Sequence, residues 1–126
     1  MTYRDVEAML CAHLPVALGV STVVELPPRF DESLPIILIQ RLSTPATNRP
    51  FNGLPLTDSA DLDIELYETS IERIRDLAAL VRDELLGWQP GGVSVSEKAA
   101  FAKRPDYNPN VRKFGGVYTA LVTRTG

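Results

Sequence analysis

Apolar positions along the chain recur with two periods, and each period predicts a different kind of element. In residues 3–14 and 70–86 they recur every three to four positions, which is the spacing of one face of an α-helix. Thr69 and Glu72 have the spacing of a capping box and predict where the second helix begins. Pro15 disfavours helical geometry in the residue before it, so the first helix is expected to end there.

Alternation of apolar and polar residues, or a short β-branched run, predicts strands in five other segments. The order of elements is then one helix, three strands, a second helix and two strands, without internal repeats. This order favours an α+β fold, with a mixed, mainly antiparallel sheet of about five strands and two helices packed on one face. A short connection separates the first two strands, so we expect them to be antiparallel neighbours. The five segments are residues 20–26, 34–42, 61–69, 93–97 and 116–124.

Residues 43–60 follow neither period. This segment holds three prolines and one glycine, has no apolar repeat, and predicts an irregular loop or arm. At about 18 residues it is longer than the roughly 12 to 15 residues that loops of compact domains usually reach. A chain of 126 residues has the length of one ordinary domain, so we expect residues 1–126 to form a single domain that carries this arm.

Composition argues against several function classes. The formal net charge of −3 gives no basic footprint for nucleic acid. The N-terminal residues lack the pattern of a signal peptide or membrane span, so synthesis in the cytoplasm is expected. Cys11 is the single cysteine and His13 the single histidine, so a catalytic triad and a structural zinc site lack their usual residues. Cys11 lies among apolar helix positions and is predicted to be a buried small hydrophobe.

The segment DLDIELYET, residues 61–69, alternates acidic and apolar residues so strictly that its acids must share one face of a strand. Consecutive residues on that face stand about 7 Å apart, a spacing compatible with a glycosidase-type pair of carboxylates or with a cation site. The same pattern is typical of a solvated strand, or of one that meets basic residues of an assembly partner, such as KR at 103–104 and VRK at 111–113. A solvated or subunit-facing row is the favoured interpretation. The acids are Asp61, Asp63 and Glu65.

Four parts of the chain, taken in order, resemble a known family. They are the helix RDVEAMLCAHL, the strand pair VSTVVELP and LPIILIQRL, the sequence DSADLDIELYETSIERIRDLAALVRDELL, and the closing RPDYNPNVRKFGGVYTALVTR. In this arrangement the chain resembles the tail terminator proteins of long-tailed bacteriophages, also called tail completion or head-tail joining proteins. The resemblance covers most of the chain and lies in element order with a few preferred residues. It departs after the second strand, where such proteins often carry glycines and this chain has STPATNRP.

The resemblance implies a non-enzymatic structural protein of the virion tail, assembled in the host cytoplasm without cofactor or membrane. Its subunits would close into a homo-oligomeric ring, expected to be a hexamer, that caps the tail tube protein and meets a head-side connector protein. DNA would pass through without specific binding, and an acidic lumen would repel its phosphates. Candidates for subunit or tube contacts are Arg49, Phe51, Leu54, Arg104 and Tyr107, and candidates for an acidic ring face are Asp61, Asp63 and Glu65.

Two other function classes stay open on the sequence. A small carboxylate-based enzyme or a metal-dependent ligand-binding domain would use the Asp61, Asp63 and Glu65 face and would surround it with a pocket. A monomeric accessory domain would instead use residues 43–60 to bind a peptide or ligand.

Overall fold

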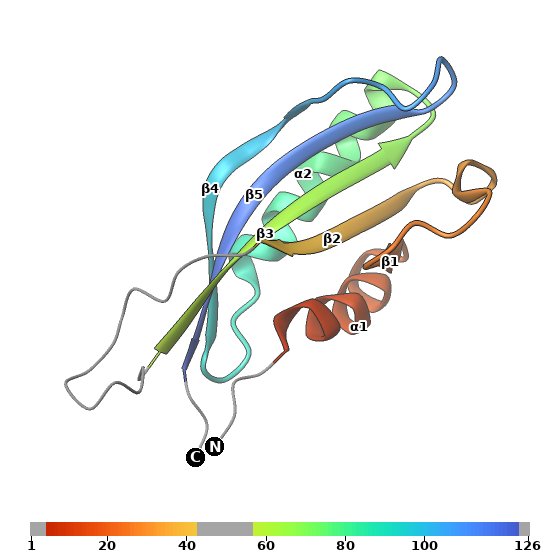
Figure 1. Ribbon diagram of the computed structural model, residues 1–126. Coiled ribbons are helices and arrows are strands. Elements are labelled where there is room, and N and C mark those ends of the chain that lie inside the picture. The colour runs from red at the N-terminus through yellow and green to blue at the C-terminus, as the bar shows by residue number, and fades with distance from the viewer. Residues whose placement is uncertain (1–4, 43–56, 124–126) are drawn as a thin grey trace.

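The computed structural model describes residues 5–42 and 57–123, which form two helices and a five-stranded sheet (Figure 1). Both helices lie on the same face of the sheet, so the predicted α+β fold and its element order are confirmed. The elements are α1 (Val6–Leu18), β1 (Ser21–Val23), the short 3-10 helix η1 (Phe30–Glu32), β2 (Ile36–Leu42), β3 (Thr57–Glu68), α2 (Ile71–Gly87), β4 (Val93–Lys103) and β5 (Arg112–Thr123).

The strands lie in the order β1-β2-β3-β5-β4, with β3 at the centre. All neighbours are antiparallel except β1 and β2, which pair in parallel from Ser21 with Ile36 to Val23 with Leu38. The prediction that these two strands are antiparallel was therefore wrong. Because β1 ends at Val23, residues 24–35 form a connection long enough to return to the start of β2, as a parallel pair requires.

The first helix continues through Pro15 to Leu18, past the end that the proline predicted. It begins at Asp5, whose side chain accepts a hydrogen bond from the Ala8 amide at 3.2 Å. Leu14 is fully buried, and this burial outweighs the local preference of a residue that precedes proline. The helix ends at Gly19, which adopts the left-handed conformation (φ 68°) and donates its amide to the Pro15 carbonyl at 2.8 Å.

The second helix matches its predicted apolar stripe but begins one residue later than the proposed capping box. Ser70, rather than Thr69, is the N-cap, and its hydroxyl accepts from the Arg73 amide at 3.2 Å. Among the described residues, neither helix is long and apolar enough to cross a lipid bilayer. The stripe faces the sheet through its buried residues Ile74, Leu77, Val81 and Leu85.

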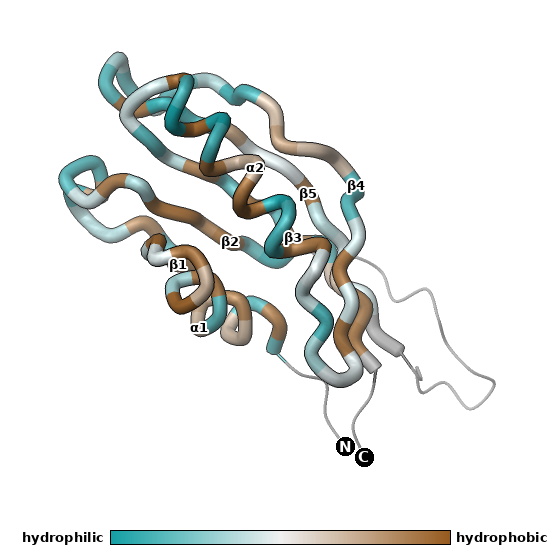
Figure 2. The backbone as a smooth tube through the Cα atoms, turned by 180° about the vertical axis from the view of Figure 1, so that it is seen from behind, coloured by the Kyte–Doolittle hydropathy of each residue, from teal (hydrophilic) through white to brown (hydrophobic). Residues whose placement is uncertain are grey.

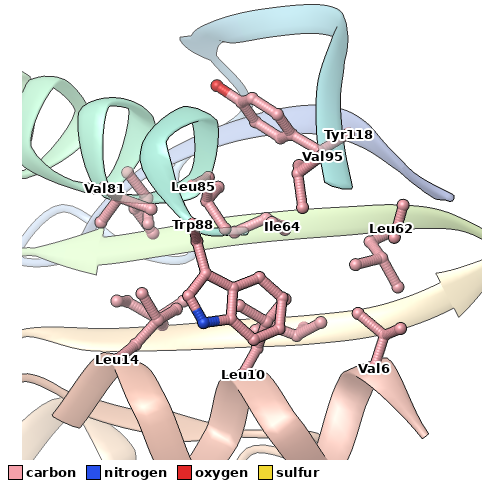
Figure 3. Packing of buried hydrophobic residues seen from close by; sticks show 14 of the residues in the cluster. Val6, Leu10, Leu14, Leu62, Ile64, Val81, Leu85, Trp88, Val95 and Tyr118 are labelled. Atoms are coloured by element: carbon pink, nitrogen blue, oxygen red, sulfur yellow. The ribbon is translucent and has the colours of Figure 1, made fainter. Parts of the chain in front are cut away.

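The main core lies between the sheet and the two helices (Figures 2 and 3). From β3, Leu62 and Ile64 are fully buried in it, and Trp88, which follows α2, contributes its indole ring. Burying one such large apolar side chain stabilises the fold by about 1.5–3 kcal/mol. At the rim of the core, the Tyr118 hydroxyl donates to Glu97 at 3.0 Å, and Arg82 of α2 also donates to Glu97 at 2.6 Å.

Three strands are longer than the sequence predicts. Residues 57–60, expected to belong to the irregular segment, are the first residues of β3, while β4 continues to Lys103 and β5 starts at Arg112. Continuous antiparallel pairing of β3 with β5, from Thr57 with Thr123 to Glu68 with Arg112, extends both strands beyond their alternating segments.

Candidate functional site

The face of the sheet away from the helices carries the acidic row of β3, as its alternation predicts. Leu62, Ile64 and Leu66 point into the main core, so Asp61, Asp63 and Glu65 point to the opposite face. The row is covered all the same, because the three acidic side chains are only 11%, 17% and 14% exposed. Lys98 of β4, Lys113 of β5 and Arg104 of the segment between them cover the row. We call these three basic residues and the three acids the charged face.

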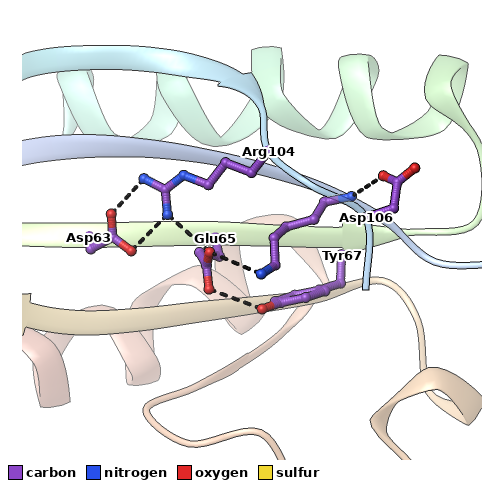
Figure 4. A network of polar contacts seen from close by, with 6 residues as sticks. Asp63, Glu65, Tyr67, Arg104 and Asp106 are labelled. Atoms are coloured by element: carbon purple, nitrogen blue, oxygen red, sulfur yellow. Dashed lines mark hydrogen bonds and ion pairs between the residues drawn. The ribbon is translucent and has the colours of Figure 1, made fainter. Parts of the chain in front are cut away.

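Arg104, just after β4, bridges two of the three acids (Figure 4). Its guanidinium donates two hydrogen bonds to Asp63, at 2.6 and 2.9 Å, and one to Glu65 at 3.0 Å. The Asp63 contact is the bidentate fork that arginine forms best with a carboxylate. These bonds, those to Asp63 most of all, raise the pKa of Arg104, so the group stays charged at every accessible pH.

Glu65 also has partners on the other side. It accepts a hydrogen bond from the Tyr67 hydroxyl at 3.0 Å, and Lys113 of β5 lies 3.6 Å from the same carboxylate (Figure 4). The Lys113 ammonium is 5.7 Å from the centre of the Tyr67 ring, within range of a cation–π contact. Burial and the bond to Glu65 raise the pKa of Tyr67, so its hydroxyl remains a donor.

Asp61 forms the other end of the charged face. It accepts from Lys98 of β4 at 2.6 Å and from the Thr119 hydroxyl of β5 at 2.7 Å. Both bonds are made to the ionised carboxylate, and first Lys98 and then Thr119 hold the pKa of Asp61 below its usual value. Asp61 is thereby held as an anion bonded to β5, the adjacent strand, and to β4 beyond it.

Local backbone features allow Arg104 to reach across the sheet. The pairing of β4 with β5 shifts register twice, between Glu97 and Ala99 and again between Ala99 and Ala102, which redirects the end of β4. Gly115 of β5 lies opposite Glu65 in the register. A β-carbon at Gly115 would fall on the Arg104 guanidinium, so glycine at this position leaves the room that the ion pair occupies.

A small aromatic cluster adjoins the charged face. Phe30 of η1 packs edge-on against Tyr67, with ring centres 5.2 Å apart, and against Tyr107 at 5.0 Å. Tyr107 is 60% exposed. Beside it Asp106 accepts from Arg112 at 2.7 Å, and this bond lowers the pKa of Asp106. The segment joining β4 and β5 is thus held on both sides, with Tyr107 presented to solvent.

The site residues predicted from the sequence differ in where they lie in the structure. The three acids share one face, and Arg104 joins them as an ion-pair partner from the same chain. Tyr107 lies nearby and exposed. From the two basic segments, Arg104 and Lys113 thus contact the acidic row of their own chain. Arg49, Phe51 and Leu54 lie outside the described residues. Sequence reasoning missed Lys98, Gly115 and Thr119.

The charged face offers charge pairing rather than a free reactive group. Each of its carboxylates already contacts a lysine or an arginine. Within residues 5–42 and 57–123, no three His, Cys, Asp or Glu side chains are grouped so that they could hold a metal ion. His13 lies elsewhere, hydrogen-bonded to Glu84 at 2.6 Å and stacked on Trp88. A scan against models of known protein families and a search of curated proteins found no match.

The lowered pKa of Asp61 predicts a specific acid sensitivity. A carboxyl group with a lower pKa in the folded chain than its ordinary 3.8 stabilises the fold above that value, and the contribution is lost as the pH falls toward the folded pKa. We expect Asp61→Asn to remove part of the stability loss below about pH 4. The measurement is the urea midpoint of both chains at pH 7, 4 and 3. Asp76→Asn on the exposed surface of α2 is the control, and parallel curves for wild type and Asp61→Asn would contradict the assignment.

Proposed function

We propose that this protein is a non-enzymatic structural subunit that assembles into a ring, of the kind that closes the tail tube of a long-tailed bacteriophage and joins it to the head. The observation that carries the proposal is the pairing of every carboxylate of the charged face with a cation. The resemblance of four consecutive parts of the sequence supports the same class of protein.

The packing of the sheet suits a subunit whose strands are held in fixed positions. The helices cover one face of the sheet with a continuous apolar core, and ion pairs across β3, β4 and β5 cover part of the other. Partly buried charge pairs with good geometry fix how elements sit relative to one another, even where their net stabilisation is modest. A subunit that must repeat one shape around a ring benefits from such fixed strands.

The charged face changes the part that the acidic row plays in this proposal. Asp61, Asp63 and Glu65 carry three negative charges, and Lys98, Arg104 and Lys113 bring three positive charges to them. A compensated face repels DNA phosphates only weakly. We therefore assign the row to holding three strands together, and we propose that the tail tube protein and the head-side connector bind to other surfaces.

The same pairing disfavours the carboxylate enzyme and the metal-dependent domain. A general acid needs a carboxyl group whose pKa is raised toward neutrality, but the pKa of Asp61 is lowered. A divalent cation at Asp63 and Glu65 would have to displace the three hydrogen bonds of Arg104. Removing a partly buried guanidinium from two carboxylates costs several kcal/mol.

The ring is tested by the native mass of the purified chain. We expect sedimentation velocity across a wide protein concentration range to reveal a closed species near six chains, unchanged by magnesium, because no metal takes part in its assembly. A mass that rises only with magnesium would favour the metal-dependent alternative. A chain that stays monomeric at all concentrations, and that also fails to bind isolated tail tubes, would overturn the proposal.

A further inference from the structure

A groove lies between the N-terminal part of α1 and residues 22–25, which include the end of β1. Its volume is about 570 Å³, and four consecutive residues, 22–25, line one side of it. Thr22 and Val23 belong to β1, whose outer edge borders the groove, and Val24 and Glu25 lie in the bend that follows the strand. In the described part of the chain no strand pairs with that edge. The remaining lining residues are Asp5, Glu7, Ala8 and Cys11 of the α1 side.

The groove has an apolar floor and an acidic rim. Ala8, Cys11, Val23 and Val24 supply small apolar surface, and Val24 is 50% exposed. Cys11 is only partly buried, contrary to the sequence prediction. The charged lining residues are all acidic, namely Asp5, Glu7 and Glu25. Burial, and after it the charges of Glu7 and Asp5, raise the pKa of the Cys11 thiol. Such a groove fits an extended segment that carries small apolar side chains and positive charge.

The opposite edge of the same sheet has that chemistry. Residues 98–103 of β4 read KAAFAK, with exposed alanines at positions 99, 100 and 102 between exposed lysines at 98 and 103. The four residues from Ala99 to Ala102 lie opposite only three residues of β5, Val117 to Gly115, so β5 does not engage all of their backbone groups. The outer edge of β4 is likewise unpaired among the described strands.

The two edges also match in level and direction. The register connects Val23 through β2, β3 and β5 to Ala102, and connects Thr22 in the same way to Lys103. β1 runs parallel to β2, and each later pair is antiparallel, so β4 runs opposite to β1. A second copy placed beside the first in the plane of the sheet would bring these edges together as an antiparallel pair.

We propose that the Lys98–Lys103 edge of one copy lies in the α1/β1 groove of the next copy, so that the sheet continues from subunit to subunit. Lys103 then faces a rim of three acids and the alanines face the apolar floor, while Lys98 keeps its bond to Asp61 of its own chain. This contact joins two different surfaces, and repeated contacts of that kind close into rings when the rotation permits. The inference rests on the proposed ring assembly and adds to it the surfaces that bind.

The test uses one charge reversal on each surface. Glu25 and Lys103 are exposed and make no side-chain hydrogen bond within the described residues, so Glu25→Lys and Lys103→Glu should leave the fold intact. Each variant alone is expected to weaken self-association about tenfold or more, because like charges then meet at every contact. An equimolar mixture of the two should recover assembly, since alternating copies restore opposite charges. Asp76→Lys on exposed α2 makes the same charge change away from both surfaces and should assemble normally.

A cysteine pair gives an independent measurement. Val24 and Ala100 lie one and two residues from Val23 and Ala102, which the register connects. Val24→Cys with Ala100→Cys, in a Cys11→Ala chain, should therefore form disulfides between copies on oxidation. The pair Val24→Cys with Leu80→Cys, on the outer surface of α2, should not. Assembly of the wild type without response to either charge reversal, and without cross-linking, would overturn this interface while leaving the ring standing. A wild type that never assembles, either alone or on isolated tail tubes, would overturn both.

Discussion

Replacing Arg104 with alanine should lower the free energy of unfolding by about 2–3 kcal/mol. Asp63 and Glu65 would lose three hydrogen bonds from one guanidinium. Glu65 would keep Lys113, but Asp63, whose side chain is 17% exposed, would have no cation beside it among the described residues. A carboxylate left partly buried without a partner destabilises more than the pair had stabilised. Urea unfolding followed by circular dichroism measures the change, with an unchanged m-value expected.

Two further variants identify the cause of that loss. If the unpaired Asp63 carboxylate is responsible, adding Asp63→Asn to Arg104→Ala should recover part of the stability, although Asp63→Asn alone is destabilising. Arg82→Ala removes an arginine whose ion pair with Glu97 is more exposed, at 49% for the arginine side chain, and should have a much smaller effect. Equal losses for Arg82→Ala and Arg104→Ala would mean that the charged face contributes no more than an ordinary surface pair.

The sequence predicts the fold best where its periodicity is repeated and buried on one side. The stripe of α2 and the alternation of β3 both locate their elements, because each buries one face against the same core. The end of β4 escapes prediction because KAAFAK has no alternation, and pairing with β5 extends it. Pro15 misleads because local preference is weaker than the burial of Leu14.

The charged face was predictable only in part. Alternation alone places Asp61, Asp63 and Glu65 on one side of a strand, and this is a local property of the chain. Their cations come from distant positions, since Lys98 is 37 residues from Asp61 and Arg104 is 41 residues from Asp63. Which basic residue reaches which acid depends on the strand order and on two register shifts. Neither can be derived from composition, and for this reason the sequence alone does not show that the basic segments pair with acids of their own chain.

A substitution at Gly115 shows whether this glycine matters for strand formation or for making room for Arg104. Valine favours strands, and glycine inside a strand weakens it, so Gly115→Val would stabilise β5 if only strand propensity mattered. The structure predicts the opposite sign, because the new side chain would occupy the position of the Arg104 guanidinium. We expect a loss of about 2–4 kcal/mol, from the displaced ion pair and from overpacking. Thermal or urea unfolding of the variant measures it.

The double variant makes this assignment decisive. The three atoms nearest to a β-carbon at Gly115 all belong to the Arg104 side chain, so in an Arg104→Ala chain Gly115→Val should cost far less than in the wild type, and the two losses should not add. Gly87→Ala, at the end of α2 where a β-carbon meets nothing within 4 Å, should be neutral or stabilising. Additive losses at 115 and 104 would show that Gly115 is needed for some other reason, and that the reach of Arg104 across the sheet does not depend on it.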